Sequence, residues 1–456
     1  MDSATTSPSA QTLLLDAPVE IERLLDTAVL DASAFRAHGL LRFATAGSVD
    51  DGKSTLIGRL LHDTKSLQDD TIEAVEISTR RRGGEGLDLA LITDGLRAER
   101  EQGITIDVAH RYFSTAKRSF VIADTPGHVQ YTRNMVTGAS TSDLAVILVD
   151  ARHGLKEQSF RHASIAAMLG LRHLVFAINK MDLVDWSFDR FHEIEVSVKE
   201  LAARLGLVDW VTIPLSALSG DNVVDRSIQT PWYAGPTLLD HLESVPLHNL
   251  SIPVGGRLSV QWIVRPTALG DTEAVGDPLG RRWYCGPASG QPLEVGNCVV
   301  VLPNGATSTV AAVSGSGAAS RIQLTDERDV SRGDTICLAP GNATERLLAN
   351  PTVSNDITAI VCAMSDEPIT AGTRLLIKHG SRTTQAIVSS VVSRLDIVTG
   401  EDVDAPDALL LNEIGRVRFT TAQPLVTDTY QVNPVTGCFI AISPATHATV
   451  LAAMID

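Results

Sequence analysis

Residues Gly47–Ser54 of this 456-residue chain read GSVDDGKS and directly follow the apolar run Leu40–Ala46. They fit the pattern G-x-x-x-x-G-K-[ST] between a strand and a helix, which is the pattern of a phosphate-binding loop. Gly47 and Gly52 allow the backbone to fold tightly, so that successive N–H groups point at phosphate oxygens. The helix that is expected to open near Lys53 adds the positive end of its dipole. The chain is therefore expected to contain an α/β domain that holds the phosphates of a nucleotide.

The side chains of this loop predict how a nucleotide and its metal would be held. Lys53 can reach the β- and γ-phosphates as a point charge, and the Ser54 hydroxyl can ligate Mg²⁺. The remaining predicted nucleotide contacts of this segment are Gly47, Ser48, Val49, Asp50, Asp51, Gly52 and Thr55.

Two further segments are typical of a nucleotide-dependent switch. Asp124-Thr125-Pro126-Gly127-His128 follows the apolar run Ser119–Ala123, so Asp124 can hold Mg²⁺ through water and Gly127 can offer its N–H to the γ-phosphate. Thr105, in the segment Gly103–Ile106, can complete the Mg²⁺ sphere and release when the γ-phosphate leaves. His128 stands where a side chain can orient the attacking water. Lys53, Thr105 and His128 are the predicted catalytic residues.

The last two segments predict which base is bound. Asn179-Lys180-Met181-Asp182 follows the apolar run Leu174–Ile178, and the Asp182 carboxylate matches the two N–H donors of the guanine edge, which adenine lacks. Ser216 and Ala217 follow the run Val211–Pro214 and could offer a backbone N–H to the guanine O6. All these segments lie at the carboxyl ends of predicted strands, where doubly wound sheets bind their ligands. The predicted ligands are GTP or GDP with Mg²⁺.

The order of apolar runs predicts an α/β domain with a mostly parallel, doubly wound sheet, followed by two β-barrel domains. Beyond Pro246 the sequence changes to short Val- and Thr-rich runs joined by turns such as Asn304-Gly305, which is typical of barrels. The predicted boundaries are a partly disordered N-terminal extension at 1–38, a nucleotide-binding domain at 39–248, and β domains at 249–348 and 349–456.

Composition excludes several other classes of protein. The net charge of −16 argues against a general duplex-DNA binder, because no basic excess exists to release counterions. No apolar run approaches the ~18 residues of a membrane span, and no basic residue precedes Arg23 as a secretory signal would require. Five scattered cysteines without a C-x-x-C pair fit reduced thiols. We expect a cytoplasmic protein that binds neither nucleic acid nor membrane.

Taken together, these motifs resemble the elongation factor Tu group of translational GTPases, in which two β-barrels follow the GTP-binding domain. Three stretches are more similar to another branch, the large GTP-binding subunit of the bacterial heterodimeric sulfate adenylyltransferase: Gly47–Leu61 with its Asp51, Asp88–Phe113, and Asp150–His162. The segments Leu375–Thr383, Leu411–Phe419 and Asn433–Ile440 resemble the last barrel of that family.

The resemblance implies a division of labour between two chains. A small, ATP-pyrophosphatase-like partner subunit would bind ATP and join it to sulfate, giving adenosine 5′-phosphosulfate and diphosphate, the first step of sulfate assimilation toward cysteine. This chain would hydrolyse GTP to drive that unfavourable reaction. The alternative is an elongation-factor-type GTPase that binds aminoacyl-tRNA.

Overall fold

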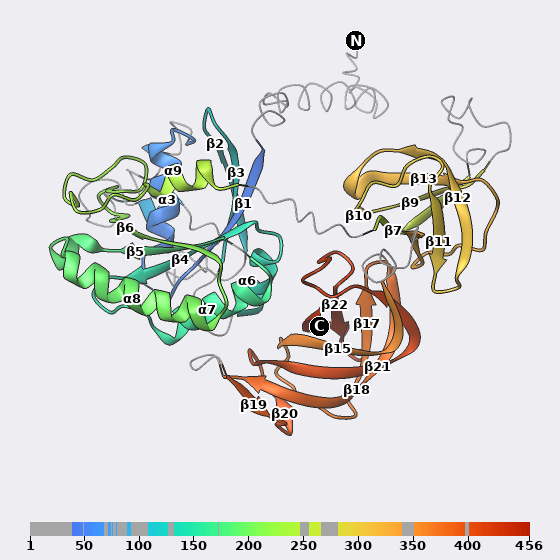
Figure 1. The fold of residues 1–456 in the computed structure, drawn as a ribbon. Helices are drawn as coiled ribbons and strands as arrows, with labels where there is room; N and C mark the ends of the chain where they lie inside the picture. The colour runs from blue at the N-terminus through green and yellow to red at the C-terminus, as the bar shows by residue number, and fades with distance from the viewer. Residues whose placement is uncertain are drawn as a thin grey trace, which may run out of the picture.

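A computed structural model describes the chain from residue 39 onward, with several internal gaps. The described residues are 39–48, 50–67, 72–73, 75, 79, 89–92, 108–125, 132–171, 173–246, 255–265, 281–339, 351–396 and 401–456. They form an α/β domain, drawn in blue to green in Figure 1, and two β domains, drawn in yellow and in orange to red.

The α/β domain is built on a six-stranded sheet in the order β2-β3-β1-β4-β5-β6. The strands are β1 Leu40–Ala46, β2 Ala109–Ser114, β3 Ser119–Asp124, β4 Leu144–Asp150, β5 His173–Asn179 and β6 Asp209–Pro214. Only β2 runs antiparallel to its neighbour, and the other pairs are parallel. Every residue of β3, β4 and β5 is buried, which agrees with their continuous apolar runs.

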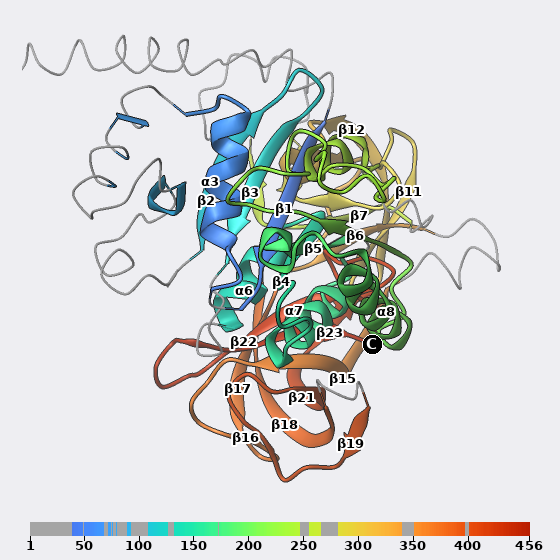
Figure 2. The same ribbon diagram turned by 90° about the vertical axis from the view of Figure 1, so that its left-hand side faces the viewer.

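Helices cover both faces of this sheet, as Figures 1 and 2 show. The helical elements are α3 Lys53–Asp63, η1 Leu89–Ile92, α6 Thr132–Ala139, α7 Glu157–Met168, η3 Met181–Val184, α8 Phe188–Arg204 and α9 Leu238–Ser244. One apolar cluster joins α6, α7 and α8 to the sheet, through residues such as Met135, Ile165 and Ile194. A second cluster joins α3 and α9 to the opposite face, through Leu56 and Leu238 among others. The sheet is thus doubly wound, as predicted.

The first β domain is closed by the segment around Gly286, which pairs with two different strands. Its strands are β7 Arg257–Ser259, β8 Trp262–Val264, β9 Trp283–Gly286, β10 Ala288–Ser289, β11 Cys298–Leu302, β12 Ala306–Ser314, β13 Ser320–Leu324 and β14 Thr335–Leu338, with the short helix η6 Gly317–Ala319. β9 pairs with β13, and after Pro287 the same segment continues as β10 and pairs with β7. A Cβ on Gly286 would lie 1.8 Å from the Ser259 carbonyl oxygen, so only glycine fits at this position.

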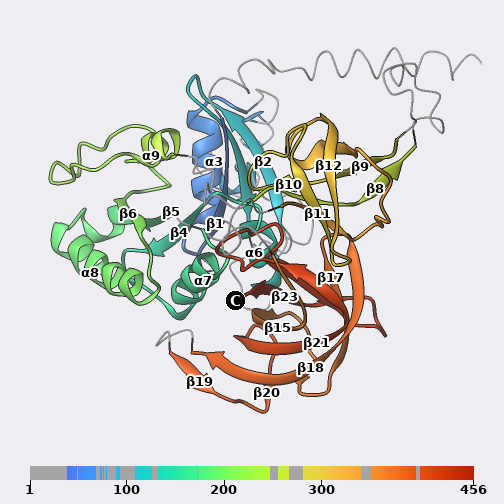
Figure 3. The ribbon, with the colours of Figure 1, turned by 45° about the vertical axis from the view of Figure 1, so that its right-hand side comes forward.

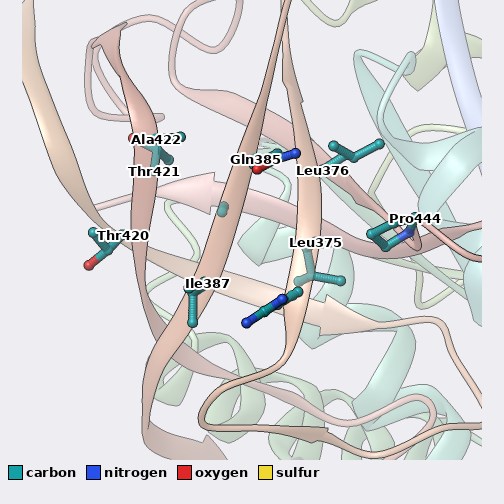
Figure 4. Close-up of a pocket in the computed structure, with 10 residues that line it drawn as sticks. Leu375, Leu376, Gln385, Ile387, Thr420, Thr421, Ala422 and Pro444 are labelled. Atoms are coloured by element: carbon teal, nitrogen blue, oxygen red, sulfur yellow. The ribbon is translucent and has the colours of Figure 1, made fainter.

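The second β domain is a closed six-stranded barrel in the order β17-β22-β23-β15-β21-β18, completed by the pairing of β17 with β18. Its strands are β15 Thr352–Ala363, β16 Ile369–Thr370, β17 Arg374–His379, β18 Arg382–Leu395, β19 Asp402–Asp404, β20 Ala408–Leu409, β21 Ile414–Thr427, β22 Cys438–Ile442 and β23 Thr449–Ile455. A cavity of about 430 Å³ on this barrel is lined by β17, β18, β21 and Pro444. Figure 4 shows the side chains that line it. With both β domains described, the predicted fold class is confirmed.

The predicted domain boundaries fall in the intervals between these units. Helix α9 ends at Ser244 and β7 begins at Arg257, while β14 ends at Leu338 and β15 begins at Thr352. The boundaries at 248/249 and 348/349 remain predictions within those intervals. The N-terminal extension, residues 1–38, lies outside the described residues.

A buried ion pair joins the two β domains. The Arg257 guanidinium lies 3.2 and 3.3 Å from the Asp428 carboxylate oxygens and also donates to the Gly255 carbonyl. Arg257 is 1% exposed. Closer to solvent, Arg382 makes a second link by donating to Asp334 Oδ1 at 2.6 Å. Because the Asp428 carboxylate also accepts from the Thr436 hydroxyl at 2.5 Å, the buried charges are well partnered.

Arg257→Met is therefore expected to lower the free energy of unfolding by about 3–5 kcal/mol, because it leaves the Asp428 charge buried and unpaired. Urea unfolding followed by far-UV circular dichroism measures this loss. Adding Asp428→Leu should recover most of it, since an apolar pair can replace a buried ion pair. The matched control is Arg416→Met, at a more exposed ion pair with Asp456, where a loss of less than about 1 kcal/mol is expected. Equal losses at both sites would contradict the prediction.

The second barrel also packs on the α/β domain, along helix α7. The Tyr430 hydroxyl donates to the Leu169 carbonyl at 2.8 Å, just beyond the end of α7. Cys362, Ile414 and Met454 of the barrel belong to the same apolar cluster as the buried residues of α7. Figure 3 shows α7 beside β23 and β15 of this barrel. Helix α7 thus contacts the sheet on one side and the barrel on the other.

Candidate nucleotide-binding site

The predicted phosphate loop joins β1 to α3, and its backbone has positive φ at two positions. Asp50 and Gly52 both have positive φ, 68° and 94°, so the backbone alternates in the manner that turns successive N–H groups toward one side. Gly52 is also needed for space, because a Cβ there would lie 2.4 Å from Asn179 Nδ2. Gly47 passes close to β4, where a Cβ would meet Leu148 at 3.1 Å. Val49 lies outside the described residues.

The first turn of α3 places the two side chains that were predicted to meet the phosphates and the metal. Lys53 and Ser54 are the first two residues of the helix, and Thr55 follows them. The residue before the helix is Gly52, so no side chain caps the helix N-terminus. The positive end of the helix dipole is therefore left for a ligand.

Asn179 and Lys180 bind the phosphate loop directly. The Asn179 amide nitrogen donates to the Asp51 carbonyl at 2.7 Å, and its oxygen accepts the Ala217 N–H at 2.9 Å. The Lys180 ammonium makes a short hydrogen bond to the Asp50 carbonyl. Three segments that are far apart in the sequence thus meet at the carboxyl edge of the sheet, as predicted from their positions after strands.

Two buried side-chain oxygen atoms in this site have no hydrogen-bond partner among the described residues. They are the Asp182 Oδ1 atom and the Ser48 hydroxyl. A buried polar atom without a partner costs free energy, so such atoms mark places where a ligand is expected to supply the partner. Met181, beside Asp182, is fully buried and anchors the segment. The residues present therefore fit a nucleotide with N–H donors on its base.

The structure assigns other partners to the N–H groups that were predicted to meet the guanine O6. Ala217 N–H donates to Asn179 Oδ1, and Ser216 N–H donates to the Asp221 carbonyl at 3.2 Å. A contact from Ala217 to a base would have to share or replace its present bond. That role remains a prediction.

The structure describes two of the three residues that were predicted to hold the metal, Ser54 and Asp124. Asp124 is 2% exposed at the end of β3, and its carboxylate lies 3.5 Å from the Thr45 hydroxyl. The Thr125 hydroxyl donates to the Thr45 carbonyl at 2.6 Å and holds this turn against β1. Thr105, Pro126, Gly127 and His128 lie outside the described residues, so their predicted roles remain predictions.

Within the described ranges, no three His, Cys, Asp or Glu side chains are grouped to hold a metal ion. Mg²⁺ in phosphate sites is usually bound by one or two protein groups plus phosphate oxygens and water. Ser54 and Asp124, placed beside a phosphate loop, fit that pattern.

The sequence did not predict the contacts within a group of charged residues beside the loop. The Asp51 carboxylate accepts the Ser48 N–H at 2.8 Å and lies 3.2 Å from the Lys156 ammonium, although Asp51 is only 1% exposed. Burial raises the pKa of Asp51, and Lys156 opposes that rise. The 105 positions between the two residues left no local signal for the pair.

Asp150, at the end of β4, is the second buried carboxylate of this group. Burial alone would raise the pKa of Asp150, but hydrogen bonds from Arg152 and Lys180 outweigh it and hold that pKa well below its ordinary value. Lys180 Nζ lies 3.0 Å from Asp150 Oδ2. Asp150 thereby orients the lysine that binds the phosphate loop.

His162 on α7 is a third buried titratable group near the loop. Burial lowers the pKa of His162 to about 3, and the charges of Lys53 and Arg161 act in the same direction. The imidazole is therefore neutral at physiological pH, and it adds no positive charge beside Lys53.

Comparison with known proteins places this site in a family. Residues 38–248 match the model of the elongation factor Tu GTP-binding domain, and residues 356–456 match the GTP-eEF1A C-terminal domain-like model. Sulfate adenylyltransferase subunit 1 of Teredinibacter turnerae is 46% identical over 91% of this chain and 87% of its own length. The same subunit of Cellvibrio japonicus is 45% identical over 91% of this chain and 86% of its own. This chain belongs to the sulfate adenylyltransferase subunit 1 family.

Another relative is the bifunctional enzyme CysN/CysC of Mycobacterium tuberculosis strain H37Rv, which is 48% identical over 91% of this chain and 67% of its own length. Membership of the subunit 1 family confirms the resemblance drawn from Asp51 and the segment Asp150–His162. The elongation factor Tu domain model agrees with guanine nucleotides as ligands. The family name also implies a partner subunit. In the described part of this subunit, no helix is long and apolar enough to cross a membrane.

Proposed function

We propose that this chain is the GTPase subunit of a heterodimeric sulfate adenylyltransferase. GTP hydrolysis on this chain drives the reaction of ATP with sulfate on a small catalytic partner, which yields adenosine 5′-phosphosulfate and diphosphate. The observation that carries the proposal is the binding of the phosphate loop by Asn179 and Lys180, which precede Asp182 in the same segment, in a chain of this family. The reaction needs an energy source because the phosphosulfate anhydride is more reactive than the bond it replaces.

Each part of the nucleotide would have its own group of residues. Backbone N–H groups of the loop other than those of Ser48 and Asp51, which are bonded within the loop, would hold the phosphates together with the Lys53 ammonium. Asp182 would accept the two N–H donors of guanine. Ser54, Thr105 and Asp124 would hold Mg²⁺, which when bound neutralises charge on the phosphate oxygens. Phosphoryl transfer depends on positioning and charge stabilisation more than on covalent chemistry by the protein. This chain provides positioning through a loop already fixed by Asn179 and Lys180.

Hydrolysis would need one further group, a side chain that orients water toward the γ-phosphorus. His128 follows the Asp124-Thr125-Pro126-Gly127 segment and is our candidate for that role. The attacking water would form the new P–O bond as the bond to the β–γ bridging oxygen breaks, leaving GDP and phosphate. The loss of phosphate would release Thr105 and so change the order of its loop.

The test is a sulfate-activation assay on this chain co-expressed with the small partner subunit. We expect GTP to raise the yield of adenosine 5′-phosphosulfate above the yield with GDP or with a non-hydrolysable GTP analogue. Equal yields under all three conditions would contradict GTP-driven synthesis. Recovery of aminoacyl-tRNA in place of a small subunit, in a pull-down analysed by mass spectrometry, would favour the translation-factor alternative.

His128→Ala separates hydrolysis from binding. GTP affinity by calorimetry should stay at the wild-type value, while the hydrolysis rate should fall by about 10²-fold, a typical contribution of one positioned acid–base group. The stimulation of phosphosulfate synthesis should fall with it. The matched control is His192→Ala, at an exposed histidine on α8 that stacks on Phe188, and it should behave as wild type. Wild-type turnover in His128→Ala with the partner present would refute the water-positioning role.

A further inference from the structure

We propose that Lys156 is a positioning residue for nucleotide binding: it neutralises the Asp51 carboxylate inside the phosphate loop, so that Asp51 can brace the loop without repelling phosphate. The inference rests on the proposed binding of guanine nucleotide to this loop. Lys156, directly before α7, would then join Asn179 and Lys180 as a residue outside the loop that holds the loop ready for its ligand.

Asp51 is fixed at three points. One carboxylate oxygen accepts the Ser48 N–H at 2.8 Å, and the other lies 3.2 Å from the Lys156 ammonium. Its backbone carbonyl accepts from the Asn179 amide at 2.7 Å. The Ser48 N–H belongs to the same loop, so the carboxylate bridges the loop from its second residue to its fifth. This bridge holds the turn closed before any phosphate arrives.

A carboxylate at this place is unexpected on electrostatic grounds. The loop and the N-terminus of α3 form an anion site, and a buried negative charge there repels phosphate at short range. Burial also favours the neutral acid, which is why the pKa of Asp51 lies above its ordinary value. Lys156 supplies the opposite charge and lowers that pKa toward the ionised form. With the lysine in place the pair is neutral as a whole, and the carboxylate can accept hydrogen bonds.

Lys156 is well held for this task. Its backbone has the extended conformation of a helix N-cap, with φ −107° and ψ 167°, directly before α7. Its N–H donates to the Ser159 hydroxyl at 3.2 Å, and its carbonyl accepts the Ser159 N–H at 2.8 Å. The side chain is 37% exposed, so the ammonium reaches the buried carboxylate from the solvent side. The backbone of Lys156 is thus fixed at the start of its helix, and the side chain reaches Asp51 from there.

The test compares the rate at which a fluorescent GDP analogue dissociates from four forms of the full chain: wild type, Lys156→Met, Lys156→Arg and Asp51→Asn/Lys156→Met. We expect Lys156→Met to speed dissociation at least tenfold, because an unpaired carboxylate then faces the phosphates. Lys156→Arg keeps the charge and should stay within about threefold of wild type. The double variant removes both charges and should recover most of the wild-type rate.

Thermal unfolding without nucleotide runs beside the rate measurement. A merely structural pair would lower the midpoint in Lys156→Met without changing the dissociation rate, and that result would overturn the proposal. If the double variant releases the GDP analogue as fast as Lys156→Met does, the proposal is overturned as well, because removing both charges should restore slow dissociation. If Lys156→Met does not fold, Lys156→Gln takes its place with the same expectations.

The matched control is Lys117→Met, which removes a lysine from an ion pair with Glu243 at 2.6 Å. Lys117 lies in the turn between β2 and β3, at the opposite end of β3 from the edge where the phosphate loop lies. This substitution should leave GDP dissociation unchanged, and a tenfold change there would overturn the assignment by showing that any lost lysine has the same effect. Absence of nucleotide binding in the wild-type chain would instead contradict the proposed function itself. The two failures are therefore distinguishable.

Discussion

Lys53→Ala is expected to weaken GTP binding to this chain by about 10²-fold or more. Lys53 opens helix α3 directly after Gly52 and is only 9% exposed, so its side chain is largely buried at the start of the helix. A hydrogen bond to a charged group contributes about 1.5–3 kcal/mol, and the lysine is expected to bind both the β- and the γ-phosphate. The expected loss of about 3–6 kcal/mol corresponds to a fall in affinity of about 10²–10⁴-fold. Isothermal titration calorimetry with GTP measures it.

The control for this substitution is Lys199→Ala, which removes an exposed lysine from α8. It should bind GTP as the wild type does. Circular dichroism of both variants should match the wild type, because alanine continues a helix at either position. Unchanged GTP affinity in a folded Lys53→Ala variant would show that the assignment of the phosphate loop is wrong.

The framework of the α/β domain could be predicted because its signals are local. The run Leu144–Val149 is continuous and apolar, and it is found as the fully buried strand β4, Leu144–Asp150. The run Ser119–Ala123 is found as β3, one residue longer. Buried parallel strands must be apolar on both faces, so their sequences stand out from the polar segments around them. Motifs placed after such strands then fall at the same edge of the sheet.

The charged contacts of the site could not be predicted in the same way. Asp51 was predicted as a nucleotide contact and Lys156 appeared only within the segment Asp150–His162, so the pairing of the two residues was not predicted. Their pairing depends on how α7 is placed against the phosphate loop, which is a property of the packed domain. The same is true of Arg257 and Asp428, which are 171 positions apart and meet only because the two β domains pack together. Side-chain partners at such separations leave no periodic or local pattern in a sequence.

The second large effect expected at this site is a change in which base is bound, and it depends on Asp182. Its Oδ1 atom is buried and has no hydrogen-bond partner among the described residues, while Met181 beside it is fully buried. A carboxylate accepts both the N1–H and the 2-amino group of guanine. A site built to bond such groups rejects an unmatched ligand by about 10⁴-fold, because its buried polar atoms are then left unpaired.

Asp182→Asn is therefore expected to lower GTP affinity by about 10³-fold or more and to create affinity for xanthosine triphosphate. The asparagine oxygen would accept the N1–H, and its amide nitrogen would donate to the 2-oxo group that xanthine carries in place of the amino group. Competition between the two triphosphates for the purified variant measures the reversal. Asp185→Asn, three positions along and exposed, is the matched control and should keep the preference for GTP. A variant at Asp182 that still prefers GTP would mean that another group reads the base. The orphaned carboxylate oxygen would then need a different partner.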